Sequence, residues 1–425
     1  MDTPVLVLLV FLSAKVLVEL WLSYLNLQEG KRRRGEVPTA FKKIVTQEEY
    51  DKSIDYMGAK GRFGMVSEIL DGIILVILAV GGLSLIYGQL DAVLPGGLGW
   101  DALLVLIIMM ILSIPALPLE WWSQFRLEEY YGFNKSTVGL WISDKLKGIV
   151  LMIVIGWPPF LAVLWVFKSF PETWWIWGWG LFFGFQMVMM ILYPMLIIPL
   201  FNKLEPLEDG DLKDSLMKLA DKAGFAAQSI QVVDGSKRST HSNAYFTGFG
   251  KFRRIVLYDT LIEHLSPREL MAVLAHEIGH YKKGHVPQML AVSAITSLGG
   301  FWFINWLITQ KDIVESFNFV IDADLRVDCL PALMMFMVFS GVFLFWMGPI
   351  MNFWSRKNEF EADDFAKKVM DEPDSLIGAL RGLHAKNLSN LVPHSAYSFF
   401  HYSHPTLLER EKALTSSQEA PNEAA

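Results

Sequence analysis

The chain has 425 residues, of which 52% are hydrophobic and 19% charged, and its net charge is −7. This composition is too apolar for a wholly soluble protein and indicates membrane and soluble parts in one chain. The single cysteine, Cys329, excludes an intramolecular disulfide and a cysteine-based metal site. Because the chain has no dominant basic patch, nucleic acid is not expected as a partner.

Seven stretches are long and apolar enough to cross a bilayer. They cover approximately Pro4–Leu25, Val66–Tyr87, Ala102–Leu119, Gly148–Phe167, Trp174–Phe201, Pro287–Ile308 and Leu330–Met351. The first stretch opens with an acidic residue and shows no clear cleavage site, so we expect it to remain attached as a membrane helix. Tryptophans near the span ends, including Trp177 and Trp306, are expected to lie at the membrane interface.

Two charged residues interrupt the first stretch. Lys15 and Glu19 are four residues apart and therefore share one helix face. Charge in hydrocarbon is costly unless it is paired or hydrated, so both side chains should face inward. Two interpretations remain open: an ion pair that holds helices together, or the wall of a hydrated cavity.

Basic residues are concentrated in alternate loops. The first loop carries the cluster Lys31–Arg34 and several further lysines and arginines, whereas the second loop, 89–101, has none. Because cytoplasmic loops hold the excess of Lys and Arg, this pattern predicts an external N-terminus. The long segment 202–286 and the C-terminal tail are then cytoplasmic.

Short β-branched runs indicate a small sheet in this long segment. Ile230–Val233 and Ile255–Tyr258 are typical of strands, and Asn243 and Ala244 lie between them. An edge strand at Asn243 and Ala244 could hold an extended peptide substrate by main-chain hydrogen bonds. The alternative is an ordinary hairpin strand with a turn asparagine.

A well-delimited helix is predicted next. Ser266 is a suitable N-cap, Pro267 occupies the first helical position, and Glu269 completes a capping box. Basic residues followed by Gly284 are typical of a helix end. The helix therefore covers the motif from His276 to His280.

This motif, His-Glu-Ile-Gly-His, is the strongest functional signal in the chain. His276 and His280 lie one helical turn apart and can share one zinc ion, and Glu277 can face water at the open position as a catalytic base. The alternative is a pair of histidines that happen to share a helix surface. A peptidase zinc needs a third protein ligand from elsewhere.

Glu359 is the predicted third ligand. It lies in a charged helical stretch after the seventh span, and Asp363 follows one turn later on the same face, while Glu361 points elsewhere. Asp363 could then hydrogen-bond a ligand histidine or help to manage protons. The alternative is that 359–364 is simply a solvated acidic face.

His404 is a further candidate, with Arg410 six residues later. We hypothesise that His404 donates a hydrogen bond to the substrate carbonyl oxygen as it becomes anionic. The alternative is an ordinary surface or core histidine, since the chain has nine histidines.

Together these features resemble the integral-membrane zinc metalloproteases called CAAX prenyl proteases, of the a-factor-converting type. The resemblance spans nearly the whole chain and rests on seven spans, Glu129-Tyr-Tyr-Gly-Phe-Asn-Lys-Ser-Thr137, Asn243-Ala244-Tyr245, the His276–His280 helix, Glu359 with Asp363, and Ser403-His404-Pro405 with Arg410. The Tyr-Gly-Phe-Asn segment distinguishes this family from the shorter heat-shock membrane proteases of the same superfamily.

The resemblance implies one zinc per chain and a role for each candidate residue. The implied zinc ligands are His276, His280 and Glu359, with Glu277 as the base and Asp363 as its partner carboxylate. The implied substrate-holding residues are Asn243, Ala244, His404 and Arg410. The implied fold is a mainly α, polytopic membrane protein, in which seven transmembrane helices enclose a chamber capped by a small α+β zinc metallopeptidase domain.

We expect four segments. Residues 1–201 hold the first five membrane helices, 202–286 the cytoplasmic zinc-peptidase segment, 287–351 two further membrane helices, and 352–425 a cytoplasmic segment with the third ligand. The tail Gln418–Ala425 lacks the basic retention signal of an endoplasmic reticulum resident. A bacterial inner membrane is therefore favoured, and the endoplasmic reticulum is expected if the protein is eukaryotic.

The expected activity is zinc-dependent hydrolysis of peptide bonds in a peptide or protein substrate, lipidated or not, at a lipid bilayer. One interpretation is a processing protease that removes C-terminal tripeptides from prenylated proteins. A second is a quality-control protease for damaged membrane proteins. A third, from another class, is a non-catalytic membrane scaffold with a structural zinc.

Overall fold

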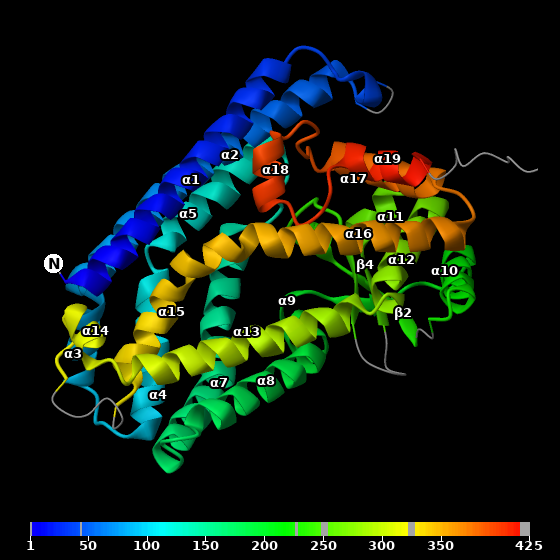
Figure 1. Ribbon diagram of the computed structural model, residues 1–425. Coiled ribbons are helices and arrows are strands. Elements are labelled where there is room, and N and C mark those ends of the chain that lie inside the picture. The colour runs from blue at the N-terminus through cyan, green and yellow to red at the C-terminus, as the bar shows by residue number, and fades with distance from the viewer. Residues whose placement is uncertain (1, 43–44, 226–227, 248–253, 322–327, 417–425) are drawn as a thin grey trace, which may run out of the picture.

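The computed structural model describes residues 2–42, 45–225, 228–247, 254–321 and 328–416 (Figure 1). The helices are α1 (Thr3–Arg33), α2 (Gln47–Ile77), α3 (Leu83–Asp91), α4 (Leu98–Ser113), α5 (Ala116–Trp122), α6 (Glu129–Tyr131), α7 (Val138–Ser169), α8 (Trp174–Leu192), α9 (Ile198–Phe201), α10 (Asp211–Lys222), α11 (Asp259–His264), α12 (Pro267–Lys282), α13 (His285–Leu307), α14 (Lys311–Ser316), α15 (Leu330–Leu344), α16 (Gly348–Met370), α17 (Asp374–Lys386), α18 (Ser395–His401) and α19 (Leu407–Ser416). The strands are β1 (Leu204–Pro206), β2 (Ser229–Val233), β3 (Ala244–Thr247) and β4 (Arg254–Tyr258).

The membrane helices agree with the seven predicted spans. Within the described ranges, six helical segments are long and apolar enough to cross a membrane, or seven if the bent pair Leu98–Ser113 and Ala116–Tyr131 is one span. That pair is bent by 46°. The bend falls at Pro115, which has no backbone N–H and clashes with the preceding turn of a helix. The predicted third span, Ala102–Leu119, is therefore broken rather than continuous.

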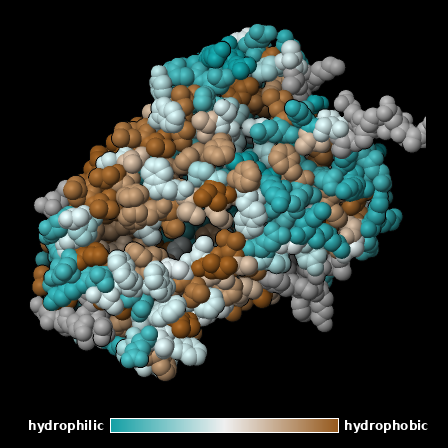
Figure 2. Space-filling view, viewed as in Figure 1, coloured by the Kyte–Doolittle hydropathy of each residue, from teal (hydrophilic) through white to brown (hydrophobic). Residues whose placement is uncertain are grey.

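The molecule has a membrane half and a soluble half. Figure 1 shows α1, α2, α4, α7, α8, α13 and α15 at one end and the sheet with α10–α12 and α17 at the other. Figure 2 shows hydrophobic side chains gathered over the first half and hydrophilic ones over the second, with a hollow between the helices. This is the chambered, mainly α membrane fold with a small α+β domain that the resemblance implied.

Each half has its own hydrophobic core. Buried apolar side chains of α1, α3, α4, α7, α8, α13 and α15 form one cluster, which includes Leu83 of α3 and Trp174 of α8. A second cluster joins α10, α12, α17 and the sheet, with Leu216, Ile230 and Ile278 fully buried. The second core fixes α12 on the sheet, because α12 contributes apolar residues at helical spacing.

The predicted sheet is present and has four strands in the order β1-β2-β4-β3. β2 pairs with β4 in parallel, with Ile230 opposite Ile255, and β1 and β3 are antiparallel to their neighbours. β3 is therefore an edge strand among the described residues, as predicted for Asn243 and Ala244. β1 was not predicted, because three residues that include a proline carry almost no strand signal.

The charged side chains of α1 that are partly buried are paired. Lys15 Nζ lies 2.5 Å from Glu68 Oε1 of α2, and Glu19 Oε2 lies 3.4 Å from His401 Nε2 of α18. The ion-pair interpretation is therefore confirmed for Lys15, with a partner on the neighbouring helix. The pair ties α1 to α2 within the membrane half.

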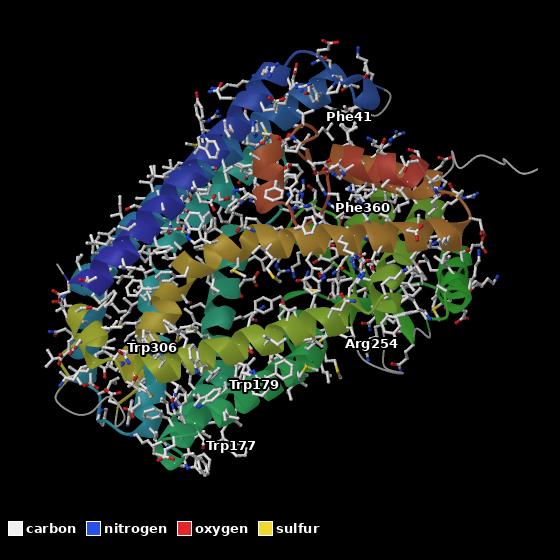
Figure 3. The ribbon with its side chains drawn as sticks, in the orientation of Figure 1. Phe41, Trp177, Trp179, Arg254, Trp306 and Phe360 are labelled. Atoms are coloured by element: carbon white, nitrogen blue, oxygen red, sulfur yellow. The ribbon has the colours of Figure 1, made fainter. Side chains whose placement is uncertain are left out.

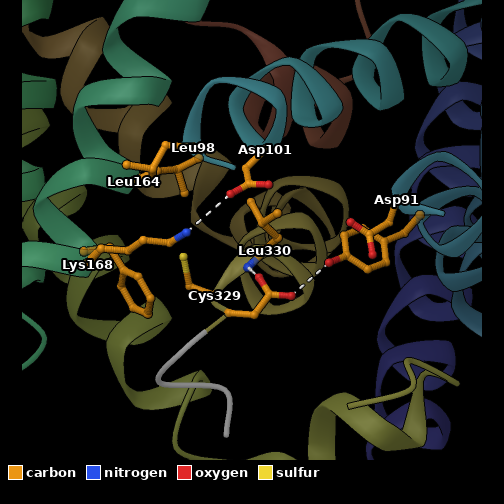
Figure 4. Close-up of a pocket in the computed structure, with 10 residues that line it drawn as sticks. Asp91, Leu98, Asp101, Leu164, Lys168, Cys329 and Leu330 are labelled. Carbon is orange, nitrogen blue, oxygen red and sulfur yellow. Dashed lines mark hydrogen bonds and ion pairs between the residues drawn. The ribbon is translucent and has the colours of Figure 1, made fainter. Parts of the chain in front are cut away.

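Polar contacts also close the ends of the helices that lie farthest from the sheet. A cavity of about 100 Å³ lies there, and Figure 4 shows residues that line it. Tyr87 Oη donates to Asp328 Oδ2 at 2.9 Å, and Lys168 Nζ lies 3.6 Å from Asp101 Oδ2. Trp177 lies at the same end of the molecule (Figure 3). The interfacial role of this tryptophan remains a prediction.

Candidate metal centre

The helix that carries the His-Glu-Ile-Gly-His motif begins and ends as predicted. Ser266 and Glu269 form a reciprocal capping box before Pro267, and the Glu269 carboxylate accepts from the Ser266 N–H at 2.8 Å. The helix ends at Lys282, and Gly284 follows with a left-handed φ of 71°. These signals fix the register of α12, so His276 and His280 face the same neighbour, α16.

The three predicted ligands meet at one point. The ligand atoms of His276, His280 and Glu359 all lie within 4.8 Å of one another. The two Nε2 atoms are 3.2 Å apart, and Glu359 oxygens lie 3.5 Å from His276 Nε2 and 3.3 Å from His280 Nε2. Ligand atoms at about 2.0–2.1 Å from a tetrahedral zinc are about 3.3–3.4 Å apart, so the observed spacing fits this ion.

An unsatisfied oxygen supports the same fit. Glu359 is 4% exposed, and its buried Oε2 has no hydrogen-bond partner within the described part of the chain. An unpaired buried carboxylate oxygen is strongly unfavourable, and a cation at the centre of the three side chains would compensate it. The alternative of a solvated acidic face is wrong for Glu359.

The electrostatics around His276 also favour a cation. Burial alone would lower the pKa of this imidazole, but the nearby carboxylates of Asp363 and Glu359 outweigh burial and raise the pKa to about 9. Surroundings that stabilise a protonated imidazole stabilise a bound metal ion for the same electrostatic reason.

Asp363 and Arg410 form a buried pair behind His276. His276 Nδ1 lies 2.8 Å from Asp363 Oδ1, and Arg410 reaches both oxygens of Asp363, at 2.8 and 2.5 Å. Arg410 is 6% exposed. Its guanidinium therefore faces the ligand shell from behind, although the resemblance implied a place among the residues that hold the substrate.

A glycine allows the two metal-bearing helices to touch. A Cβ on Gly279 would lie 3.0 Å from both Cα and O of Ala362 on α16. Gly279 lies between the two ligand histidines, so the backbones are closest where the ligands converge. The close contact explains why this residue is glycine, since any side chain would separate the histidines from Glu359.

Two candidate catalytic side chains lie beside the ligands. Glu277 is partly buried, and burial raises the pKa of its carboxyl group. His404 has an exposed side chain, and its Nε2 lies 3.3 Å from Glu359 Oε1 while its Nδ1 lies 3.0 Å from Ser403 Oγ. His404 is therefore at the open side of the cluster.

The edge strand β3 lies beside the metal helix and packs against α12. Asn243 O accepts from the Tyr258 N–H of β4 at 3.1 Å. Because residues of an antiparallel strand alternate between pointing their backbone N–H and C=O groups at the partner strand and away from it, those of Ala244 point toward the free edge. The Ala244 N–H donates to Asn243 Oδ1 at 2.8 Å. Asn243 and Ala244 therefore present main-chain and side-chain hydrogen-bonding groups together.

The Tyr-Gly-Phe-Asn segment contacts the chain just before β3. Gly132 has a left-handed φ of 90° and ends α6, which turns Phe133 onto His241 with the rings stacked at 4.3 Å. Asn134 forms a bridge with Ser239. The segment therefore supports the approach to Asn243 and lines a pocket of about 770 Å³ between the membrane and soluble halves.

Sequence reasoning missed His285, the first residue of α13. Its Nδ1 lies 2.9 Å from His280 Nδ1, and its Nε2 lies 3.3 Å from Glu361 Oε2. Its position five residues after His280, just past a glycine stop, was a usable signal, because a left-handed residue reverses the chain locally. Glu361 does point away from the ligands, as predicted, but toward His285.

Comparisons with known proteins agree with this geometry. Residues 26–203 match a family model whose description is "CAAX prenyl protease N-terminal, five membrane helices". Residues 206–418 match the model of peptidase family M48. CAAX prenyl protease 1 of Saccharomyces cerevisiae is 35% identical, over 95% of this chain and 93% of that protein. The CAAX prenyl protease 1 homologs of Arabidopsis thaliana and Homo sapiens are 36% and 30% identical, over 92% and 95% of this chain and 93% and 94% of those proteins.

A solved structure has the same fold. The crystal structure of S. mikatae Ste24p matches with a TM-score of 0.88 and 34% identity, over 97% of this chain and 99% of that one. Membership of a metallopeptidase family favours an enzyme over the non-catalytic scaffold. The chain therefore belongs to peptidase family M48, and it is a multi-pass membrane zinc metalloendopeptidase.

Proposed function

We propose that this enzyme trims the C-termini of lipidated proteins at the membrane surface, as the names of its relatives suggest for them. The observation that carries the proposal is the position of the ligand cluster. It lies where α12 and α16 cross, and α12 leads into membrane helix α13 while α16 follows membrane helix α15. A substrate tail tethered to the bilayer by a lipid could reach this crossing.

We propose that His276, His280 and Glu359 hold the zinc and that the other residues act around it. Bound zinc supplies Lewis acidity, which acidifies water and polarises the scissile carbonyl. Glu277 takes a proton from the attacking water and delivers it to the leaving amine. A carboxyl group whose pKa is raised by burial is better suited to carry this proton between the two transfers.

Substrate contacts are assigned to the open side of the centre. The free edge of β3, at Asn243 and Ala244, would bind an extended peptide by main-chain hydrogen bonds. His404 Nε2 would donate a hydrogen bond to the carbonyl oxygen as negative charge develops there. Asp363 and Arg410 would act as positioning residues, since Asp363 contacts His276 and Arg410 contacts Asp363.

We propose that the metal centre faces the cytoplasm. The support is the excess of Lys and Arg in the first loop and its absence from 89–101. In this proposal segments 202–286 and 352–425 form the catalytic part, and segments 1–201 and 287–351 the bilayer part. The bacterial inner membrane stays a prediction, since the tail Gln418–Ala425 on which it rests lies outside the described residues.

A pair of matched peptides tests the substrate class. Purified enzyme is incubated with a farnesylated CAAX peptide and with its unlipidated twin, with and without a zinc chelator. We expect at least a tenfold higher kcat/KM for the lipidated peptide and loss of both activities on chelation. Equal rates would instead support the quality-control protease, and no cleavage by zinc-loaded enzyme would contradict peptide trimming.

A further inference from the structure

We propose that His285 and Glu361 form a relay that positions His280 in the metal centre. This proposal rests on the ligand set of the proposed function. His276 is held directly by a carboxylate of α16, Asp363, at 2.8 Å. Among the described residues, no carboxylate contacts His280 at its Nδ1, and His285 occupies that position instead.

The contacts form a continuous chain from the centre to the surface. His280 Nδ1 lies 2.9 Å from His285 Nδ1, and the two rings are nearly perpendicular, at 70°. His285 Nε2 lies 3.3 Å from Glu361 Oε2. The His285 side chain is only 2% exposed, whereas that of Glu361 is 38% exposed. The turn at Gly284 brings His285 back onto the end of α12.

One arrangement of protons satisfies these contacts. His280 Nε2 faces His276 Nε2 and Glu359, so its lone pair must point at the metal and its proton must sit on Nδ1. A hydrogen bond between two Nδ1 atoms needs one donor and one acceptor, so His285 Nδ1 accepts. The proton of His285 is then on Nε2, where it donates to Glu361.

The relay makes α16 the support of both ligand histidines. Its residue Glu359 is a ligand, Asp363 orients His276, and Glu361 orients His280 through His285. Outer partners of this kind fix the tautomer and ring orientation of a metal-bound histidine, and their loss weakens metal binding by 10–100-fold as a rule. A merely space-filling role for His285 would place no demand on its nitrogen atoms.

The test compares variants of the full-length protein in detergent. Each protein is stripped of metal and titrated with zinc in competition with a chromophoric chelator, and its Co²⁺ complex is examined by visible absorption. We expect His285→Leu to weaken zinc binding by about 10–100-fold and to alter the Co²⁺ spectrum. His285→Asn should restore most of the affinity, because its Oδ1 can accept from the His280 Nδ1–H.

Two controls complete the design. Gln288→Leu changes an exposed residue one turn further along α13 and should bind zinc like the wild type. His280→Ala should lose tight zinc binding. A wild-type protein without tight binding, or a His280→Ala variant that binds like the wild type, would refute the proposed ligand set and the relay with it, whereas a normal result for both controls leaves the His285 variants to test the relay alone.

The relay itself is overturned by either of two results. His285→Leu with zinc affinity within twofold of the wild type would show that the imidazole positions nothing. If His285→Asn binds zinc as weakly as His285→Leu, the shape of the imidazole matters and not its hydrogen bond with His280. If His285→Leu does not fold, Glu361→Leu at the partly exposed end of the relay takes its place. The expected loss is then severalfold, and unchanged affinity would refute the proposal.

Discussion

Each candidate ligand histidine of the metal centre contacts a side chain that lies outside the ligand set. The brace of His276 is the buried Asp363–Arg410 pair, in which both oxygens of the carboxylate accept from one guanidinium. Removing one partner of a buried ion pair leaves an uncompensated charge and costs about 3–5 kcal/mol. Arg410 therefore stabilises the metal centre through Asp363, although it lies far from His276 in the sequence.

At the residue scale, Glu277→Gln should separate metal binding from catalysis. The amide has nearly the same shape as the carboxyl group but cannot take a proton from water, so we expect zinc content and unfolding temperature to stay unchanged while peptide cleavage falls at least 10³-fold. Zinc analysis and a peptide cleavage assay measure the two properties. Wild-type cleavage by this variant would contradict the assignment of Glu277 as the base.

Sequence reasoning at this scale found what is local and missed what depends on tertiary contacts. The spacing of His276 and His280 is a helical property, so their common face could be predicted from the motif and the capping signals of its helix. The partner of Arg410 and the contact of His285 with His280 depend on how α19 and α13 return to α12. No local pattern encodes the return of α19, so the contact of Arg410 with Asp363 could not be predicted. The left-handed Gly284 was a local signal for the return of α13, but His285 was left without a role.

The decisive packing between elements is that of α12 on α16. Gly279 brings the two backbones into direct contact at Ala362. The capping box and the left-handed Gly284 fix where α12 starts and stops, so the contact occurs at the turn that carries the histidines. A shift of either helix along its axis would separate Glu359 from both imidazoles.

At the element scale, Gly279→Ala should damage the metal centre despite the better helix propensity of alanine. The gain is about 1 kcal/mol, whereas forcing a methyl group against a backbone costs typically 1–3 kcal/mol. We expect zinc affinity to fall severalfold, as measured by chelator competition. Gly139→Ala is the matched control, because a Cβ there meets nothing within 4 Å. Equal affinities of the two variants would argue against a packing role for Gly279.

Elements with a strong hydrophobic pattern or clear capping residues could be predicted from the sequence. Features that depend on contacts with neighbouring helices or strands could not. The apolar spans and α12 follow from composition and capping. The break at Pro115 was missed, because proline is tolerated in membrane helices and only neighbouring helices decide whether it bends one. β1 exists only because Leu204–Pro206 pairs with β2.

At the scale of the whole molecule, the metal centre joins regions that are far apart along the chain. Residues 276–280 belong to the soluble core, and Glu359 belongs to a helix that continues a membrane span. A bound zinc ion therefore cross-links α12 to α16 in the folded state only. Ligands of this kind stabilise a protein by about 4 kcal/mol at a thousandfold excess over their Kd.

Removal of zinc should consequently lower the unfolding temperature of the whole protein. We expect the chelated enzyme to unfold several degrees earlier than the zinc-loaded enzyme in a thermal scan, and re-addition of zinc to restore the original value. His280→Ala should show no zinc-dependent shift. A wild-type unfolding temperature that does not change with zinc would mean that the metal centre contributes nothing to the stability of the folded protein.

The order of the ligands along the chain has a consequence for biosynthesis. His276 and His280 leave the ribosome before α13 and α15, and Glu359 leaves after them. The ligand set is therefore incomplete until both intervening helices have been made. A nascent chain that ends before Glu359 therefore lacks one of the three ligands and cannot hold zinc in the complete site.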